Sequence, residues 1–319
     1  MAESISIIMT VYNQGDYVRP AIESLLRQTV GNFDFIVVDD GSEDHSYEEI
    51  LRLSDPRLRI FRVEHRGRGA ALNFALAQTN APWIAFADAD DISVPDRLSL
   101  QQEALKEDQT IDAMSGSYQM VDATGASMGI KHLPANHGDI VALMPVHCSM
   151  CFPAALIRRE TLTKIGGFNE RFEAAIDYDL WLRMIGTARF RNLSAVLLKK
   201  RITPGSISVR LKDIQSKGAY EMANRYLTER FRSAIDAEEQ KDVLLQLGKL
   251  EYYHGTMKMA RRHLRKLLWN KPHGMEAWRF YVAGCLGDVV FRFFREKGIA
   301  TAIGGLLRGR DGKGHFFSP

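Results

Sequence analysis

The sequence predicts an α/β protein whose mostly parallel central sheet is flanked by helices and followed by a C-terminal helical extension. Two observations support this fold class. Up to about residue 106, short apolar stretches alternate with stretches of helical periodicity. Strands that alternate with helices form parallel sheets with right-handed crossovers. From residue 211 onward, by contrast, helical periodicity dominates.

The first elements follow one another at short intervals. Residues 4–11 (SISIIMTV) form an apolar run that is typical of a buried strand. Apolar residues then recur at helical spacing from Val18 to Leu26, with Asp16 as the expected N-cap and Pro20 in the first turn, where proline is tolerated. The same pattern predicts further strands at 33–42, 58–63 and 82–87, and a helix at 69–78.

Beyond residue 95 the patterns are less continuous. Residues 95–106 predict a helix with proline in its first turn, and residues 123–147 predict a loop-rich crossing. The segment TLTKIGGFNE predicts a helix that ends at Gly166 and Gly167. The remaining predicted elements are one or two strands at 112–121, a helix at 177–185, and two amphipathic helices within 241–274 that break near Gly255 and at Pro272.

The composition is that of an ordinary soluble globular protein. Its 319 residues are 45% hydrophobic and 25% charged, a length that suits one large domain or two, and the change of pattern predicts domains at 1–210 and 211–319. No apolar run reaches the roughly 18 residues of a membrane span, and the first residues do not resemble a signal peptide. Three cysteines cannot form a disulfide framework. We therefore expect a cytoplasmic protein.

Charge is distributed unevenly along the chain. The net charge of +3 divides into −5 for residues 1–210 and +8 for residues 211–319, and residues 261–319 alone hold 12 basic against 4 acidic residues. This basic tail, interleaved with apolar residues, predicts peripheral contact with an anionic membrane at the inner face of the plasma membrane; a solvated basic face is the alternative. We expect no nucleic-acid partner. The stretch 241–274 resembles one tetratricopeptide unit, which cannot bury its own core alone and is expected to pack on the first domain, or else to bind a partner.

The most informative local feature is a cluster of carboxylates. In WIAFADADDIS, Asp88, Asp90 and Asp91 directly follow a predicted strand. Like charges this close raise one another's pKa values unless a positive charge shares the site, so the cluster requires a counter-charge. Asp39 and Asp40 end a second strand in the same way. Ligands of parallel α/β sheets bind beyond the carboxyl ends of the strands, which is where both acidic groups are expected.

Four motifs follow one another along the chain: VVDDGS at 37–42, FADADD at 86–91 with PDRL at 95–98, GGFNE at 166–170, and DYDLWLR at 177–183. In this order they resemble the family 2 inverting glycosyltransferases, enzymes of glycosyltransferase A fold that use nucleotide-diphosphate sugars. The resemblance covers residues 4 to about 210. It implies one catalytic domain whose first half binds the nucleotide and whose second half binds the acceptor.

The resemblance implies a divalent cation, Mn²⁺ or Mg²⁺, which prefers oxygen ligands and neutralises a diphosphate leaving group. By this resemblance Asp90 is the metal ligand, Asp88 reaches the ribose or the metal, and Asp91 supports them. An acidic turn that binds nothing is the alternative.

The same resemblance assigns the donor nucleotide to the loop that begins with Thr10 and Tyr12. An aromatic ring with the Asp40 carboxylate suits a uracil or thymine base, so a UDP-sugar is the favoured donor. Alternatively, Tyr12 is a core aromatic and Asp40 a turn cap. Arg66 and Arg68 precede a helix N-terminus, which attracts anions, and are candidates for contacting the nucleotide; a solvated basic turn is the other interpretation.

On the acceptor side the resemblance implies that Asp177 is the general base. The family has an acidic pair just before the DLWLR helix, and here Ile176 replaces its first member. Asp179 is a substitute, or a first-turn acid favoured by the helix dipole. Trp181 fits either the acceptor site or the core. Thr203 stands where relatives often have a histidine that assists the metal or diphosphate, so that role has no candidate.

These features predict a metal-dependent inverting glycosyltransferase that acts on a glycan or lipid-linked acceptor, in cell-surface polysaccharide synthesis. It is expected to be non-processive, because the chain has no QxxRW sequence. A noncatalytic nucleotide-sugar binding or scaffold protein that uses the helical tail is the alternative. A sugar nucleotidyltransferase would require a Gly-rich phosphate loop where TVYNQGD stands, and a haloacid-type phosphatase would require DxDx[TV] on the first strand.

Overall fold

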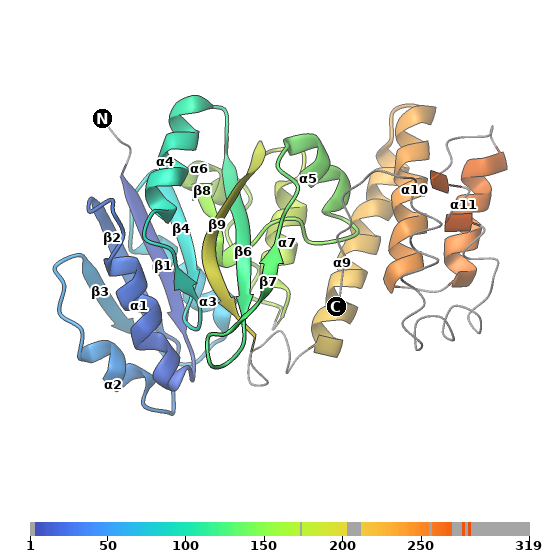
Figure 1. Cartoon of the computed structure of the whole chain (residues 1–319). Coiled ribbons are helices and arrows are strands. Elements are labelled where there is room, and N and C mark those ends of the chain that lie inside the picture. Colours follow the sequence, from blue (N-terminus) through green and yellow to red (C-terminus); the bar gives the residue numbers. More distant parts are fainter. Residues whose placement is uncertain are drawn as a thin grey trace. The chain divides into compact units, whose positions relative to one another are not determined.

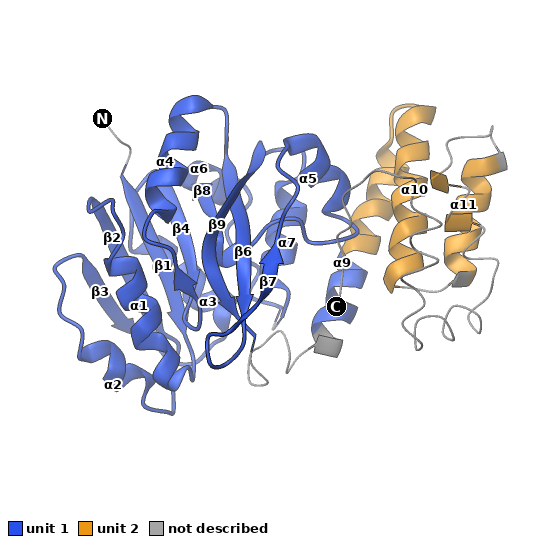
Figure 2. Cartoon of the chain, viewed as in Figure 1, with its two compact units in different colours: residues 1–222 blue, residues 223–319 orange. Residues whose placement is uncertain are grey.

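A computed structural model describes residues 4–172, 174–202, 212–254, 257–269, 276–277 and 280–281 (Figure 1). The chain separates into two compact units, Met1–Met222 and Ala223–Pro319 (Figure 2). The division falls within helix α9, Lys212–Ser233. The domain boundary expected after residue 210 stays a prediction.

The first half of unit 1 is a parallel α/β arrangement, as predicted. Each predicted strand is present, and each is parallel to its neighbour within the order β3-β2-β1-β4. The connections between consecutive strands contain the helices. The strands are β1 (Ile5–Val11), β2 (Phe33–Asp39), β3 (Leu58–Arg62) and β4 (Trp83–Asp88), and the helices are α1 (Val18–Leu26), α2 (Ser46–Leu51) and α3 (Arg68–Ala77).

The second half of unit 1 extends the same sheet in the order β4-β8-β6-β9-β5, with β7 paired to β6. Because β8 is antiparallel to both neighbours and β9 is parallel to β6, strands β6 and β9 run in the direction of β4. Their carboxyl ends therefore reach the same edge. The strands are β5 (Ile92–Ser93), β6 (Ala113–Val121), β7 (Ser127–Lys131), β8 (Leu156–Arg158) and β9 (Phe190–Arg201). The helices are α4 (Arg97–Glu107), α5 (His137–Leu143), α6 (Arg159–Lys164) and α7 (Ile176–Met184), with short 3₁₀ turns η1 (Gly15–Tyr17) and η2 (Phe152–Ala154).

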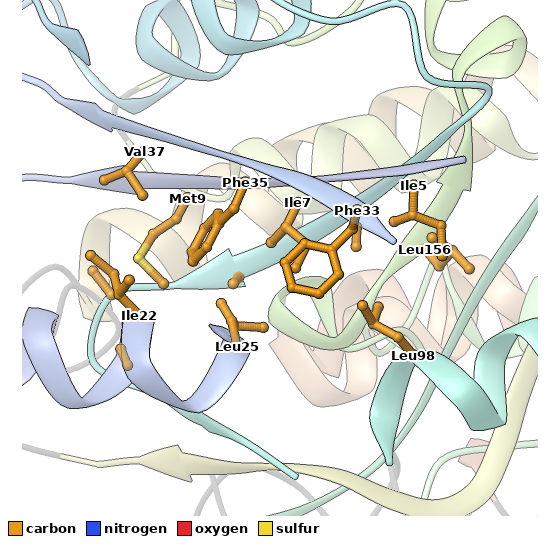
Figure 3. Close-up of a cluster of buried hydrophobic side chains, with 14 of the residues drawn as sticks. Ile5, Ile7, Met9, Ile22, Leu25, Phe33, Phe35, Val37, Leu98 and Leu156 are labelled. Atoms are coloured by element: carbon orange, nitrogen blue, oxygen red, sulfur yellow. The ribbon is translucent and has the colours of Figure 1, made fainter. Parts of the chain in front are cut away.

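The core of unit 1 explains why these apolar stretches form strands. In β1 alternate residues share a face, so Ile5, Ile7 and Met9 point together toward α1 and meet Ile22 and Leu25 (Figure 3). All five are at most 1% exposed, which fixes the register of β1 because a one-residue slip would turn this face away from α1.

Two local expectations differ from the structure. Asp16 is not the N-cap of α1: it lies in η1, and its carboxylate is 2.9 Å from His45 Nε2. The extra 3₁₀ turn moves the first residue of α1 to Val18, with Tyr17 before it. The crossing at 123–147 contains β7 and α5, and the short elements α2 and β8 and the long strand β9 were not predicted.

Arg97 of the PDRL motif is buried in the core and forms no ion pair with a carboxylate of the described residues. Its guanidinium donates to the carbonyl oxygens of Phe86 (2.7 Å) and Ala155 (3.2 Å) and to Ser93 Oγ (3.2 Å). Burial lowers the pKa of Arg97 to about 10, so the group remains charged at neutral pH. These bonds tie the end of β4 to the segment before β8 and to β5, and so hold the backbone that carries Asp88.

Arg97→Met is therefore expected to lower the free energy of unfolding by roughly 2 to 5 kcal/mol, since two buried carbonyl groups lose their charged donor while the volume is largely kept. The measurement is urea unfolding followed by circular dichroism. Arg27→Met is the control, because Arg27 is exposed and its one ion pair among the described residues is with Glu23; it should change stability by no more than about 0.5 kcal/mol. Equal midpoints for the two variants would contradict the structural role of Arg97.

The predicted helical extension is confirmed in α9, α10 (Ala237–His254) and α11 (Met257–Trp269). In unit 2, Leu247 and Leu264 are buried, and a Cβ on Gly248 would lie 2.6 Å from Leu264, so glycine allows α10 and α11 to approach closely. The predicted breaks at Gly255 and Pro272 lie outside the described residues. Among the helices that the structure describes, none is long and apolar enough to cross a membrane.

Candidate active site

The candidate site lies at the carboxyl edge of the sheet, around β1 and β4. The strand order reverses at β1, whose neighbours are β2 and β4, and ligands of open α/β sheets bind at such a switch point. Thr10 of β1 is opposite Asp88 of β4, and Val11 is opposite Asp39 of β2. The register therefore places the two predicted acidic groups at the ends of β2 and β4, on the two sides of β1.

The acidic cluster has its counter-charges within the chain. Carboxylate oxygens of Asp88, Asp90 and Asp91 lie within 4.8 Å of one another. Arg68, at the start of α3, donates to Asp88, and Lys200 Nζ near the end of β9 is 3.7 Å from Asp88 Oδ2. The Arg68 guanidinium also lies 5.1 Å from the Phe152 ring centroid. Two basic side chains thus face one carboxylate of the cluster.

The pKa values of the three acids diverge because their surroundings differ. Burial opposes the charge of Asp88, but Arg68 and Lys200 outweigh it and hold the pKa of Asp88 below its ordinary value. Burial and the Asp88 charge raise the pKa of Asp90. Burial also raises the pKa of Asp91 to about 8, with Lys200 acting against it and the other two acids adding to it. Asp90 and Asp91 therefore lack sufficient compensating positive charge.

Asp91 links the acidic loop to the end of β9. It is buried, its Oδ1 accepts a hydrogen bond from the Arg201 N–H at 2.8 Å, and its Oδ2 has no partner among the described residues. The Arg201 side chain donates to the carbonyl oxygens of Asp90 (3.2 Å) and Ala123 (2.9 Å). The end of β9 therefore fixes the backbone of the acidic loop.

The residues present fit a divalent cation. Hard cations prefer carboxylate oxygens, and three are gathered here. The orphaned Oδ2 of Asp91 and the raised pKa of Asp90 are both features that a nearby cation would relieve.

On the other side of the switch point, Tyr12 stacks on His65 with ring centroids 4.0 Å apart and planes 13° from parallel. The buried Asp40 carboxylate accepts hydrogen bonds from the backbone N–H groups of Arg66 and Gly67, both at 3.1 Å, and lies 2.9 Å from His65 Nδ1. Asp40 thus holds the turn after β3, in which Gly67 has φ +92°. Asp40 therefore has the turn-capping role that was one of its two interpretations from the sequence. Contact of Asp40 with a nucleobase stays a prediction.

The two arginines at the N-terminus of α3, Arg66 and Arg68, occupy different environments. Arg66 is 72% exposed, and its guanidinium is 3.9 Å from Glu170, whereas Arg68 points to Asp88. Arg68, and not Arg66, therefore contacts the acidic cluster. Thr10 is half-buried at the end of β1. The donor-binding roles of Thr10, Tyr12 and Arg66 stay predictions.

On the acceptor side, Asp177 and Asp179 share the first turn of α7 but differ in their partners. Asp179 is 4% exposed and accepts a 2.8 Å hydrogen bond from Arg183, which also donates to the Ile165 carbonyl oxygen. Asp177 is half-buried and has no hydrogen bond to any described residue, while its charge acts on Arg68. Trp181 is fully buried and belongs to the core.

Sequence reasoning missed Lys200 and His65 and did not single out Arg68. The available signals were weak: two lysines close an apolar strand in LLKKR, and a histidine precedes the turn in EHRGRG. In the segment HCSMC, residues 147–151, Cys151 is buried and Cys148 is exposed.

Comparisons with known proteins place the chain among glycosyltransferases. The profile of the family described as "Glycosyl transferase family 2" matches residues 6–166. An uncharacterized glycosyltransferase of Rickettsia felis is 34% identical over 209 residues, which are 62% of this chain and 34% of that protein. The O-antigen biosynthesis glycosyltransferase WbnJ of Escherichia coli is 29% identical over 63% of this chain and 80% of its own length. The chain thus spans about a third of the first of these relatives.

Solved structures show the same fold. The mannosyltransferase PcManGT from Pyrobaculum calidifontis, in complex with GDP-Man and Mn²⁺, superposes with a TM-score of 0.58 at 18% identity, covering 98% of this chain and 89% of its own. Residues 1–349 of Staphylococcus aureus TarS in complex with UDP-GlcNAc give a TM-score of 0.54 at 18% identity, covering 88% and 89%. These similarities support the glycosyltransferase A architecture.

Proposed function

This chain belongs to glycosyl transferase family 2, and we propose that it moves a sugar from a nucleotide-diphosphate sugar to a hydroxyl of a glycan or lipid-linked acceptor, with inversion and with Mn²⁺ or Mg²⁺. The observation that carries this proposal is the meeting of three carboxylates with Arg68 and Lys200 at the switch point of the sheet. A role in cell-surface polysaccharide synthesis is supported by the similarity to an O-antigen biosynthesis enzyme.

The donor is proposed to lie across β1 and β4, with its base near Tyr12 and its diphosphate near Asp88. The stacked pair of Tyr12 and His65 offers an aromatic surface for the base. UDP-sugars are the favoured class, which the TarS complex with UDP-GlcNAc supports; the PcManGT complex contains GDP-Man, so the base requires its own test. Asp90 and Asp88 would hold the cation, which when bound would neutralise charge on the diphosphate.

The chain's own groups then account for the transfer. Asp177 takes the proton of the acceptor hydroxyl as its oxygen bonds to the anomeric carbon. The bond from that carbon to the diphosphate oxygen breaks, and its electron pair leaves with the diphosphate. Attack opposite the leaving group inverts the configuration, so an α-linked donor gives a β-linked product. Asp177 is suited to this step because Arg183 already engages Asp179.

Thermal-shift screening against nucleotide sugars, with and without Mn²⁺, tests the proposed function. Ligands that bind only the native state raise its melting temperature, so one nucleotide sugar should stabilise the protein in Mn²⁺ and lose most of this effect in EDTA. The absence of a shift with every UDP- and GDP-sugar would contradict the proposal.

We also propose that the basic C-terminal region contacts an anionic membrane surface. Most of residues 261–319 lie outside the described residues, but α11 is described. Its buried side contains Ala260, Leu264 and Leu267. Four exposed basic residues of α11 have the spacing i, i+4, i+7 and i+8, which places them on one side of the helix. They are Lys258, Arg262, Arg265 and Lys266.

The double variant Arg262→Glu, Arg265→Glu is expected to bind vesicles of phosphatidylserine and phosphatidylcholine at least about 30-fold more weakly, since each basic residue near such a surface is worth about 1 kcal/mol. Flotation of the full chain measures this. Lys106→Glu with Arg27→Glu makes the same charge change at exposed positions of unit 1 and should float like wild type. If both double variants float equally, α11 is not the contact.

A further inference from the structure

The loop of residues 166–172 contacts two helices that carry charged groups of the site. It lies between α6 and α7 in the chain, and Asp177 belongs to the first turn of α7. Just before the loop, the Ile165 carbonyl oxygen accepts a 2.8 Å hydrogen bond from Arg183 of α7. The centre of the loop is bonded to α3, the helix that begins with Arg68. The loop therefore links the helix of the proposed base to the helix of Arg68.

Asn73 of α3 binds this loop through three hydrogen bonds. Its Oδ1 accepts from the Phe168 N–H at 2.9 Å. Its Nδ2 donates to the Phe168 carbonyl oxygen at 2.9 Å and to Glu170 Oε1 at 2.8 Å. One carboxamide thus uses both its acceptor and its donors, and it holds both backbone polar groups of one residue. An ionised aspartate has the same shape but can only accept.

Two glycines allow the loop to lie this close to α3. Gly69 is four residues before Asn73, on the same side of the helix, and a Cβ on Gly69 would lie 3.2 Å from the Asn169 carbonyl oxygen. A Cβ on Gly167, whose φ is +70°, would lie 2.7 Å from Asn73 Oδ1. The backbone of the loop therefore packs directly on the helix, which restricts its position.

Aromatic packing connects Phe168 to the same two helices. Phe168 is buried, and its ring meets the ring of Phe152 edge to face, with centroids 5.8 Å apart. The Arg68 guanidinium lies 5.1 Å from the Phe152 centroid, and the Trp181 ring of α7 lies 6.2 Å from it. A shift of Phe168 would therefore disturb the packing of both Arg68 and α7.

We propose that Asn73 is a positioning residue of the transfer reaction: by holding Phe168 and Glu170, it sets the place of Asp177 relative to the sugar donor. This inference rests on the proposed function and adds to it a residue that acts through the base. The Asp177 carboxylate has no hydrogen bond to a described residue, so its place depends on the backbone of α7. A misplacement of about 1 Å can cost about 100-fold in rate.

Hydrolysis of the donor tests this role without an acceptor. Water then takes the place of the acceptor hydroxyl. Asp177 accepts a proton of the water as its oxygen bonds to the anomeric carbon, and the bond to the diphosphate breaks with its electron pair on the diphosphate. The probes are UDP-glucose, UDP-galactose, UDP-GlcNAc and GDP-mannose in Mn²⁺, and the released UDP or GDP is measured.

Asn73→Ala should lower kcat of this hydrolysis by about 10- to 100-fold and leave KM for the nucleotide sugar unchanged. Asn73→Asp keeps the acceptor for the Phe168 N–H but loses both donated bonds, and it should show the same separation of kcat from KM. Asn80→Ala is the matched control, because it makes the same change at an exposed position after α3, and it should keep the wild-type kcat.

Two further measurements separate positioning from loss of folded protein. In calorimetry with UDP or GDP and Mn²⁺, Asn73→Ala should bind with the affinity and stoichiometry of wild type. In the background of Asp177→Asn, adding Asn73→Ala should slow hydrolysis by less than about twofold, because residues that act through one group are not additive.

Hydrolysis by Asn73→Ala at the wild-type rate would overturn the inference. The same loss of rate from Asn73→Ala in the wild-type and Asp177→Asn backgrounds would also overturn it, because Asn73 would then act independently of the base. If wild type releases UDP or GDP from none of the four nucleotide sugars, it is the proposed function that fails.

Discussion

Asp177→Asn is expected to lower the rate of sugar transfer by about 10²- to 10⁴-fold, the usual contribution of a general base. Asparagine keeps the shape of the side chain but cannot accept the proton of the acceptor hydroxyl. Asp177 has no hydrogen bond to described residues that the change would break, so donor affinity and thermal stability should be nearly unchanged. Steady-state kinetics with calorimetric donor binding would separate these effects.

Asp179→Asn is the matched control, because it makes the same change two residues along the same helical turn. Asp179 is buried against Arg183, so this variant should lose thermal stability. Residual product of Asp177→Asn should still be β-linked when the donor is α-linked. Transfer at the wild-type rate by Asp177→Asn, or selective inactivity of Asp179→Asn at full stability, would show that the base has been misassigned.

Asp90→Ala is expected to abolish the dependence of nucleoside diphosphate binding on Mn²⁺. Arg68 and Lys200 act first on Asp88 and hold its pKa down, whereas the pKa of Asp90 is raised. Asp90 is also half-buried, whereas Asp91 is buried. Calorimetry of UDP and GDP with and without Mn²⁺ measures the effect. Asp96→Ala removes a nearby exposed carboxylate and should retain the full metal dependence. An unchanged response in Asp90→Ala would remove it from the metal site.

The parallel half of the fold could be predicted because its strands are continuous apolar runs separated by helical patterns. The antiparallel additions could not. β8 has only three residues. β9 mixes polar and apolar residues, and its pairing with β6 shifts register along the strand. Asp16 was misjudged for a similar reason, since nothing local distinguishes an N-cap from a residue of a preceding 3₁₀ turn.

The candidate site was predictable where its residues are neighbours in the chain. Asp88, Asp90 and Asp91 lie within four positions, so their repulsion, and the need for a counter-charge, follow from the sequence. The identity of that counter-charge does not, because Lys200 reaches Asp88 only through the pairing of β6 and β9. Arg66 and Arg68 are two residues apart on either side of the turn at Gly67, and the sequence does not indicate which one points to the cluster.

The central claim is that this chain uses the acidic cluster and a divalent cation to cleave a nucleotide-diphosphate sugar. The most direct measurement is release of UDP or GDP from a panel of nucleotide sugars by the full chain, in Mn²⁺ and in EDTA, without added acceptor. Slow release from at least one sugar nucleotide in Mn²⁺, abolished by EDTA and by Asp90→Ala, is the predicted result. Release that continues unchanged in EDTA, or no release and no binding of any donor in Mn²⁺, would contradict the account.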